Sequence, residues 1–408
     1  MKKTAALLLS LALILSLAAC ETGPAGGSKS PDASPSGSAE EPTTPIYVNE
    51  YTQALAGVDA DTVMFTVDGL DVTAEFYFYW LYHDCYTMDQ NYRQYLGTPL
   101  DFDETSDDGT TAAQYLKEDA RKFAAVYAVL EREAQAAGAG ATEEQKAQWE
   151  AQKAAYIAQE GRDTFDDLLR RQGLSEESFD RLSLMSTVLV TNAAEKLVPD
   201  PTEEEAEQFR TDNSVYGAKH ILIRTVVQNE DGTVSFARGG TPKGAGGGDY
   251  TGTAEEYNAA ALEKINGILD QLKAADDPAA RFDELMVQYS EDPGLAAYPD
   301  GYTFGPGEMV EAFEEGTKAL AYGAYSPEPV QSGDGYHIIL RTVPDVTELY
   351  RGAKMNELMN GWAELEYVTT PAYDRLDVKD FYEKGTAYAA RFDETPAPSG
   401  SPSGGDGN

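Results

Sequence analysis

The sequence predicts an α+β protein in which short strands stand among helices. Residues 218–224 and 335–341 are short runs rich in strand-forming residues, and each carries a histidine followed by branched apolar side chains. Before and after these runs, apolar residues recur three and four positions apart, which is the spacing of one helix face. We therefore expect a mostly helical chain that contains one small sheet.

The N-terminal residues have the three-part layout of a secretion signal. A charged start is followed by an apolar stretch over 5–19 and then by Cys20. The stretch is shorter than the roughly 20 residues that a membrane span needs. A cysteine directly after small residues resembles a lipobox, which implies cleavage before Cys20 and a lipid on its sulfur. Residues 1–19 are thus expected to be a signal peptide, and the alternatives are a simply cleaved signal or an uncleaved anchor.

Cysteine content and charge exclude several classes of protein. Once Cys20 is used, only Cys85 remains, so an intrachain disulfide is excluded and burial must supply the stability. The formal charge of −39 argues against nucleic-acid binding, which depends on Lys and Arg. It also argues against adhesion to anionic lipid headgroups. A solvated acidic surface is the simplest interpretation.

Composition marks both ends of the chain as unstructured. Residues 20–60 and 395–408 are rich in Gly, Ser, Pro and Ala, and they cannot bury enough apolar surface to become ordered. We interpret the first as a lipidated disordered tether and the second as a disordered tail.

Between these ends, the expected elements follow in order. A short strand at 63–67 and a turn at 68–69 precede a helix over 73–95 that is rich in aromatic residues. Core packing is the simpler account of those aromatics, and a surface that faces client proteins is the alternative. After an acidic loop, helical spacing or helix start and stop signals mark segments near 116–130, 142–145, 165–169, 179–190, 201–205, 348–367 and 378–390.

The two histidines frame a recognisable series of motifs. Buried imidazoles need hydrogen-bond partners, so His220 and His337 in similar strands suggest one shared polar site. Between them lie the segments 282–285 (FDEL), 289–293 (YSEDP), 304–310 (FGPGEMV) and 313–314 (FE). In order and spacing these segments resemble the parvulin family of peptidyl-prolyl isomerases. With the lipoprotein start and the flanking helices, the whole chain resembles the PrsA-type foldase lipoproteins.

The resemblance implies a domain organisation and a function. A parvulin-type domain at 213–344, with a small antiparallel sheet flanked by helices, is expected to be inserted into a mostly helical SurA/PrsA-like chaperone domain formed by 61–212 and 345–394. The protein would isomerise Xaa-Pro bonds of exported, unfolded proteins. It would be held at the extracytoplasmic face of the cell membrane by the lipid on Cys20, without a cofactor or metal. A homodimer is left open.

The same resemblance assigns roles to individual residues. His220 and His337 would form a stacked pair at the floor of the site, oriented by Asp292 and completed by the Ser332 hydroxyl. Met309 and Phe313, four residues apart on an expected helix, would form the proline pocket. Tyr302 and Phe304 would add to the substrate-binding wall.

Two departures from the family pattern bear on these roles. Residues 299–303 replace a glycine-rich run and its leucine, and Tyr302 is the expected substitute. A glycine-rich insertion over 225–257, interpreted as flexible, shows 225–227 (TVV) where phosphoserine-specific parvulins carry arginines, so phosphate recognition is not expected.

Other functions remain as alternatives. The altered pocket run fits a catalytically weak or inactive parvulin-like holdase. Acidic exported lipoproteins are often solute receptors, but the alternating strand-helix pattern of that class is missing from the sequence. His220, Asp292 and His337 are suitable metal ligands by type, although the resemblance assigns them to a metal-free network. His83 is expected to be an ordinary helix residue.

Overall fold

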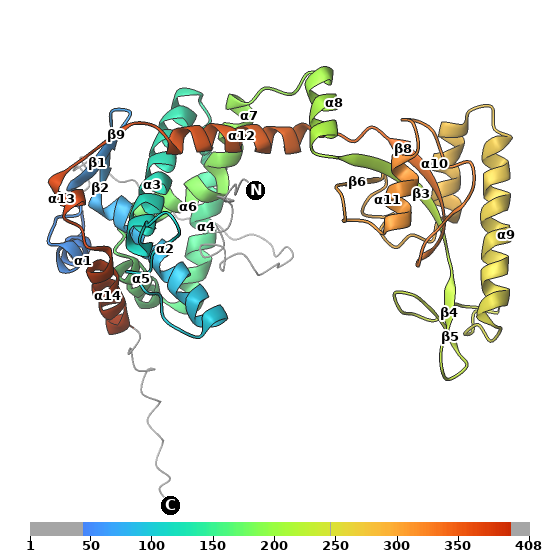
Figure 1. Ribbon diagram of the computed structural model, residues 1–408, viewed down its shortest axis with the longest axis horizontal. Helices are drawn as coiled ribbons and strands as arrows, with labels where there is room; N and C mark the ends of the chain where they lie inside the picture. Colours follow the sequence, from blue (N-terminus) through green and yellow to red (C-terminus); the bar gives the residue numbers. More distant parts are fainter. Residues whose placement is uncertain (1–43, 245, 393–408) are drawn as a thin grey trace, which may run out of the picture. The chain divides into compact units, whose positions relative to one another are not determined.

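The computed structural model describes residues 44–244 and 246–392. The chain folds into two compact units, of which the first runs to Pro199 and resumes at Gly352, and the second is Asp200–Arg351. Figure 1 traces the elements of both units in chain order. The predicted signal peptide at 1–19, the lipidated Cys20 and the tail at 395–408 lie outside the described residues.

Helices form most of the first unit. Its N-terminal part consists of α1 (Ile46–Ala56), β1 (Val63–Val67), β2 (Leu70–Thr73), α2 (Ala74–Asn91), a π-helical turn (Tyr92–Leu96), α3 (Ala112–Ala136), α4 (Glu143–Glu160), α5 (Arg162–Gln172), α6 (Glu176–Leu184), a second π-helical turn (Met185–Leu189) and α7 (Val190–Leu197). The capping box predicted at Thr142 and Gln145 is present, and α4 begins there. The chain returns with β9 (Tyr367–Thr369), α13 (Pro371–Asp374), α14 (Val378–Ala389) and a short 3₁₀ turn (Ala390–Phe392).

Helix α1 corrects the prediction of a disordered tether over residues 20–60. Val48, Tyr51 and Leu55 follow helical spacing and are buried. The Tyr51 ring lies over Gly173, where a Cβ atom would stand 2.1 Å from the ring. The prediction was wrong for residues 46–56 because it relied on the composition of the whole segment, which is rich in glycine and proline. That composition concealed one short helix with a buried face.

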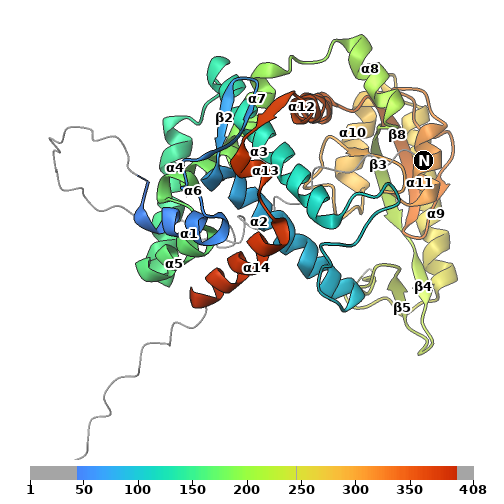
Figure 2. The ribbon, with the colours of Figure 1, turned by 60° about the vertical axis from the view of Figure 1, so that its left-hand side comes forward.

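The aromatic residues of α2 form the core of the first unit. Phe76, Tyr77, Phe78 and Trp80 are all buried. The Phe78 ring lies 4.9 Å from that of Phe381 on α14, so the returning segment completes the same core. Figure 2 shows α14 beside α1 and α2. Core packing, rather than a client-facing surface, therefore accounts for these four aromatics, whereas Tyr86 of the same helix is exposed.

The returning segment also completes a small sheet with strand order β2-β1-β9. Strand β9 pairs antiparallel with β1, with Tyr367 opposite Val67. This corrects the helix predicted over 348–367, because α12 (Thr347–Ala363) ends four residues before that strand begins. Leu349 and Leu358, two of the apolar positions that predicted the helix, are exposed.

The second unit is built on a four-stranded sheet with strand order β6-β3-β8-β7. All its pairings are antiparallel, and β3 pairs with β8 along nearly its whole length. The elements are α8 (Glu203–Asp212), β3 (Tyr216–Arg224), β4 (Val226–Gln228), β5 (Val234–Phe236), α9 (Ala254–Lys273), α10 (Pro278–Tyr289), β6 (Tyr302–Phe304), α11 (Glu311–Lys318), β7 (Val330–Gln331) and β8 (Gly335–Thr342). The predicted α+β class, with small antiparallel sheets among helices, is confirmed.

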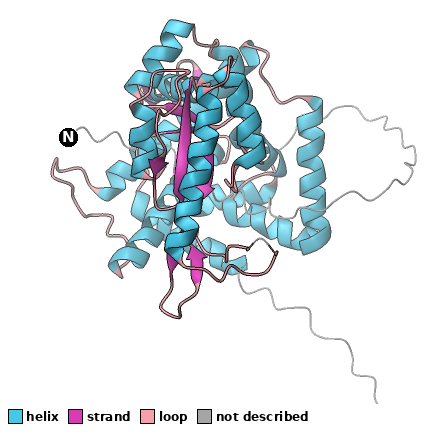
Figure 3. Cartoon of the chain, turned by 90° about the vertical axis from the view of Figure 1, so that its right-hand side faces the viewer, coloured by secondary structure: helices cyan, strands magenta, loops and turns pink. Residues whose placement is uncertain are grey.

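Strand alternation separates two faces of this sheet. Ile221 and Ile223 of β3, with Ile338 of β8, pack into a buried cluster with α9 and α10. Figure 3 looks onto the side of the sheet that α9 covers. The alternate residues, including Ala218 and Ile339, face the opposite side and pack against Phe313 of α11. Both histidines belong to this second face, so the site lies between the sheet and α11.

The insertion over 225–257 is partly ordered, which corrects its interpretation as simply flexible. Strands β4 and β5 form an antiparallel hairpin. The Asn258 side chain of α9 hydrogen-bonds both backbone groups of Val226, at 2.8 and 2.9 Å. A short aromatic cluster of Phe236, Tyr250 and Tyr257 fixes the hairpin to α9. The sequence average missed these anchors because they lie between glycine-rich stretches.

The second unit is also wider than the predicted range of 213–344. Helix α8 belongs to it, because the buried Arg210 side chain donates to the Pro344 carbonyl at 3.2 Å. The described part of the chain contains no helix long and apolar enough to cross a membrane.

Candidate active site

The two histidines meet across neighbouring strands. Leu222 of β3 is directly opposite His337 of β8, so His220 lies diagonal to His337 on the same face. Their rings are nearly parallel, with centroids 5.2 Å apart and an interplanar angle of 16°. The two Nδ1 atoms lie 3.0 Å apart, which is a hydrogen-bond distance. Both side chains are buried.

Each outer ring nitrogen also has a partner. His220 Nε2 lies 3.0 Å from Asp292 Oδ2, and His337 Nε2 lies 2.7 Å from the Ser332 hydroxyl. The same Asp292 oxygen accepts a 2.7 Å hydrogen bond from the Tyr302 hydroxyl. The four residues predicted as catalytic are thus brought into one continuous network, to which the structure adds the Tyr302 hydroxyl.

The charge of Asp292 fixes the direction of this network. Burial alone would raise its pKa, but hydrogen bonds from His220, Tyr302 and the Gly294 backbone N–H outweigh that effect and lower the pKa to about 2. An ionised carboxylate only accepts, so His220 donates through Nε2. With one proton on the His220 ring, at Nε2, its Nδ1 accepts from His337 Nδ1, and His337 then accepts at Nε2 from Ser332.

His337 is held neutral by its surroundings. Desolvation first, and then the neighbouring His220, lower the pKa of His337 to about 3. The same Asp292 contact changes Tyr302, because burial and the hydrogen bond to the carboxylate raise the pKa of its phenol. The floor of the site is therefore a set of oriented dipoles with one fixed negative charge at Asp292.

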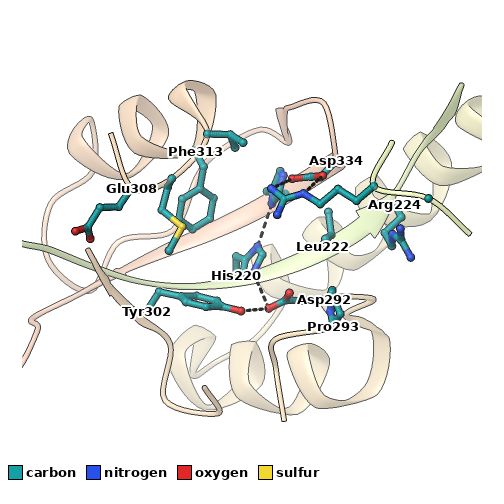
Figure 4. A pocket seen from close by; sticks show the side chains of 14 residues that line it. His220, Leu222, Arg224, Asp292, Pro293, Tyr302, Glu308, Phe313 and Asp334 are labelled. Carbon is teal, nitrogen blue, oxygen red and sulfur yellow. Dashed lines mark hydrogen bonds and ion pairs between the residues drawn. The ribbon is translucent and has the colours of Figure 1, made fainter. Parts of the chain in front are cut away.

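An apolar wall stands beside this floor. The Phe313 ring of α11 meets both histidine rings edge to face, at 5.1 Å from His220 and 5.6 Å from His337. Met309 and Val310 line the wall with it, in a pocket of about 680 Å³. Figure 4 shows Phe313 and Glu308 at one end of this pocket, and His220 between them and Arg224. The lining residues are His220, Leu222, Arg224, Arg238, Gly239, Asp292, Pro293, Tyr302, Glu308, Met309, Val310, Phe313, Asp334 and His337.

Met309 reaches the wall by a route that differs from the predicted one. Helix α11 begins at Glu311, so Met309 precedes it and does not share a helix face with Phe313. The buried Glu314 carboxylate instead accepts hydrogen bonds from the backbone N–H groups of Gly307 and Met309, at 2.8 and 3.1 Å. This carboxylate positions the turn that presents Met309, a role that was not predicted for Glu314.

Two predicted site residues stand behind the pocket surface. Phe304 is buried beneath Phe313, with ring centroids 5.8 Å apart, and it does not line the pocket. Its prediction as a substrate-binding residue is corrected, because residue 304 pairs with Tyr216 at the sheet edge. Ser332 reaches the pocket only through His337.

Four charged lining residues were not predicted, and Glu308, next to Met309, is one of them. Arg224 ends β3, Arg238 follows β5 in the insertion, and Asp334 precedes β8. Arg238 holds Asp334 through two hydrogen bonds of 2.8 and 2.7 Å. Alternation along β3 could have indicated Arg224, since 220, 222 and 224 share one face, but nothing local pointed to Arg238.

Metal coordination finds no support in the geometry. Across the described ranges 44–244 and 246–392, no group of three His, Cys, Asp or Glu side chains is arranged to hold a metal ion. All four ring nitrogens of the histidine pair are already engaged in hydrogen bonds. His83 lies outside this site, on α2.

A comparison with family models locates a known domain in the second unit. The family model "Rotamase: PPIC-type PPIASE domain" matches residues 248–342. Foldase protein PrsA of Geobacillus kaustophilus is 39% identical over 98 residues, which are 24% of this chain and 33% of that protein. Foldase protein PrsA 4 of Bacillus cereus is 41% identical over 114 residues, which are 28% of this chain and 38% of that protein.

These matches cover part of each protein only. The chain spans about a third of the length of these two curated relatives. Among solved structures, the alignment with PrsA from Bacillus subtilis covers 84% of this chain and 96% of that chain, at 15% identity and a TM-score of 0.23.

The family model starts after β3, yet β3 pairs with β8 inside the matched range and places His220 against His337. The resemblance to the parvulin isomerases is thereby confirmed for this part of the chain. The protein carries a PPIC-type peptidyl-prolyl isomerase domain of the kind found in the PrsA foldases.

Proposed function

We propose that the protein is an extracytoplasmic foldase that catalyses cis-trans isomerisation of Xaa-Pro bonds in exported, unfolded proteins. The observation that carries the proposal is the stacked pair of His220 and His337, bounded by Phe313 and oriented by Asp292. The matched isomerase domain supports it. Attachment to the membrane through a lipid on Cys20 belongs to the same proposal and rests on the sequence of the N-terminus.

The chemistry requires neither a nucleophile nor a cofactor. Rotation about the peptide bond has a barrier of about 18–20 kcal/mol because resonance must be broken. Before proline the uncatalysed exchange takes tens of seconds or longer. A site accelerates it by binding the twisted amide better than either planar form. Here Phe313 and Met309 would hold the proline ring, and the Xaa-Pro imide bond would lie over the rings of His220 and His337.

The network suits a twisted amide in two ways. The apolar wall lowers the local polarity, which favours the less charge-separated twisted form over the planar amide. The dipoles of His220, His337 and Ser332 are held by hydrogen bonds before substrate arrives, so they need no reorganisation during rotation. Both effects act on the transition state, as catalysis requires.

A peptide assay tests the proposal directly. Wild-type protein should accelerate isomerisation of a short Xaa-Pro peptide, and His220→Ala should lose most of that acceleration. Far-UV circular dichroism of both proteins controls for folding. No acceleration over buffer by the wild-type protein would refute the isomerase function.

A holdase function of the first unit is the second candidate. A pocket of about 380 Å³ in that unit is lined by Met88, Tyr92 and Tyr115 beside acidic residues of the loop that precedes α3. Such a surface fits an extended segment with apolar side chains. The test is suppression of client aggregation by wild-type and His337→Ala protein. If both proteins suppress aggregation equally, the binding of clients would be assigned to the first unit. If the variant no longer suppresses aggregation, a purely non-enzymatic holdase would be excluded.

A further inference from the structure

One end of the isomerase pocket is positively charged in a strongly acidic chain. Arg224 and Arg238 both line it, whereas the whole chain has a formal charge of −39. Figure 4 shows Arg224 and Asp334 at the end of the pocket away from Glu308. In a chain this acidic, solubility does not require arginines in a binding pocket, so their presence there points to a role in binding.

The insertion builds this end of the pocket. The Arg224 guanidinium lies over the Phe236 ring of β5, with Cζ 3.7 Å from the ring centroid. Two residues further along, Arg238 reaches Asp334 and forms a two-pronged ion pair. Since Asn258 anchors the hairpin to α9, both arginines are held by ordered structure.

The two arginines differ in how their charge is balanced. The charge of Arg238 is matched by Asp334. In the part of the chain that the structure describes, no ion pair involves the Arg224 guanidinium, which contacts the Phe236 ring instead. Asp292 is engaged by His220 and Tyr302 and offers it no partner. No ion pair among the described residues therefore balances this guanidinium, which is half-buried at the pocket edge. The neighbouring Glu291 carboxylate accepts a hydrogen bond from the Arg224 backbone N–H but forms its ion pair with Lys264.

Strand geometry places that charge near a bound proline. Residues 220, 222 and 224 lie on the same face of β3, and all three line the pocket. Along a strand, four residues span about 13 Å, and an extended peptide advances about 3.4 Å per residue. With the proline ring on Phe313 and its imide over the histidines, a side chain one or two residues away comes within reach of the long Arg224 side chain.

We infer that Arg224, supported by Phe236 and Arg238 of the insertion, forms a subsite for an acidic side chain next to the isomerised proline. The inference rests on the proposed isomerase function and adds a substrate class to it. Glutamate or aspartate beside the proline would be favoured over neutral or basic residues. The insertion thereby acts as a specificity element of the site.

The number of free cations favours a carboxylate over a phosphate. A carboxylate carries one charge and matches the planar fork of one guanidinium. A phosphate group carries nearly two charges, while the second arginine here is already paired with Asp334. This agrees with the sequence-based expectation, which excluded phosphate recognition because residues 225–227 hold no arginine.

Matched peptides test the subsite. Peptides that differ only by Glu, Gln, Lys or phosphoserine beside the proline are compared by kcat/KM, with the variable residue placed first before and then after the proline. We expect the wild-type protein to favour Glu over Gln about fivefold at one of the two positions at low ionic strength. In Arg224→Gln, the ratio of kcat/KM for the Glu peptide to that for the Gln peptide should fall towards one. The Arg224→Glu variant should favour the Lys peptide over the Gln peptide.

The control is Lys243→Gln, in the same insertion. Lys243 pairs with Asp249 and does not line the pocket, so this variant should keep the wild-type ratio. Equal wild-type values for Glu and Gln at both positions would overturn the inference while leaving the isomerase proposal intact. So would a preference for phosphoserine without any preference for Glu.

The inference can also be decided independently of turnover. The same peptides with a fluorescent label give dissociation constants, and the Glu-to-Gln ratio of these constants should show the same dependence on Arg224. If no peptide is isomerised but this ratio changes as expected, the isomerase proposal fails and the anion subsite stands. A ratio of one in the wild-type protein refutes the subsite by this second route.

Discussion

The Tyr302 hydroxyl and the His220 Nε2 atom hydrogen-bond the same Asp292 oxygen, at 2.7 and 3.0 Å. Asp292 therefore has two donors on the oxygen that orients the histidine pair, and Gly294 N–H occupies the other oxygen. This arrangement makes Tyr302 a positioning residue for the floor of the site as well as part of its wall.

Removing this hydroxyl should shift the acid limit of activity. In Tyr302→Phe the ring stays but one donor is lost, so the pKa of Asp292 should rise from about 2 by roughly one unit. Since the network needs the ionised carboxylate, the acidic limb of the kcat/KM profile should move to higher pH. Tyr298→Phe is the control, because Tyr298 only packs on the Tyr302 ring, at 4.9 Å. Superimposable profiles for wild type and Tyr302→Phe would contradict the role.

Burial of neutral His337 should make stability fall in mild acid. Its pKa is about 3 when folded and 6.5 in the reference state, so between these values the unfolded chain binds more protons. The contribution is fully present above pH 6.5 and decreases as pH falls, by at most about 1.4 kcal/mol per pH unit.

Chemical denaturation of the protein at pH 7.5 and pH 5 measures this loss. His337→Leu should be less stable at pH 7.5 because Ser332 and His220 lose a partner, but its free energy of unfolding should change less between the two pH values. An unchanged pH dependence in the variant would exclude His337 as its source.

Met309 should contribute to substrate binding more than to folding. It is half-buried and lines the pocket, so Met309→Ala should lower kcat/KM for an Xaa-Pro peptide about tenfold through lost apolar contact. Val287→Ala, on the exposed side of α10, should have no effect on the rate. Thermal melting of both variants should remain within a few degrees of the wild type. A wild-type rate for Met309→Ala would remove Met309 from the proline pocket.

The packing of α1 predicts a large difference between two similar glycines. Gly57 and Gly173 have positive φ values of 67° and 65°. A Cβ atom at Gly57 meets nothing within 4 Å, whereas one at Gly173 would overlap the Tyr51 ring. Gly57→Ala should cost about 1 kcal/mol for backbone strain alone. Gly173→Ala should cost clearly more, as measured by urea denaturation, and equal costs would show that α1 does not pack there.

The sequence predicted the elements whose signals lie within a few neighbouring residues. The turn at 68–69, the α4 capping box and the α2 helix all depend on local backbone preferences and side-chain spacing. The same holds for the series of motifs between His220 and His337, whose order matches the confirmed isomerase domain. Helix α1 was not predicted because its apolar pattern is short and follows a long stretch rich in glycine and proline.

The sequence by itself determined the α+β class, the helical segments and the pair of histidine strands, because those properties are encoded in local composition and periodicity. The tertiary structure alone decided that the Tyr302 hydroxyl meets Asp292, that Glu314 positions Met309 and that Arg238 reaches Asp334 across 96 residues. Such contacts depend on strand register and on the direction of side chains from separate elements. Even where the partners are close in sequence, as Glu314 and Met309 are, spacing does not say which way a side chain turns, so only the folded chain reveals the contact.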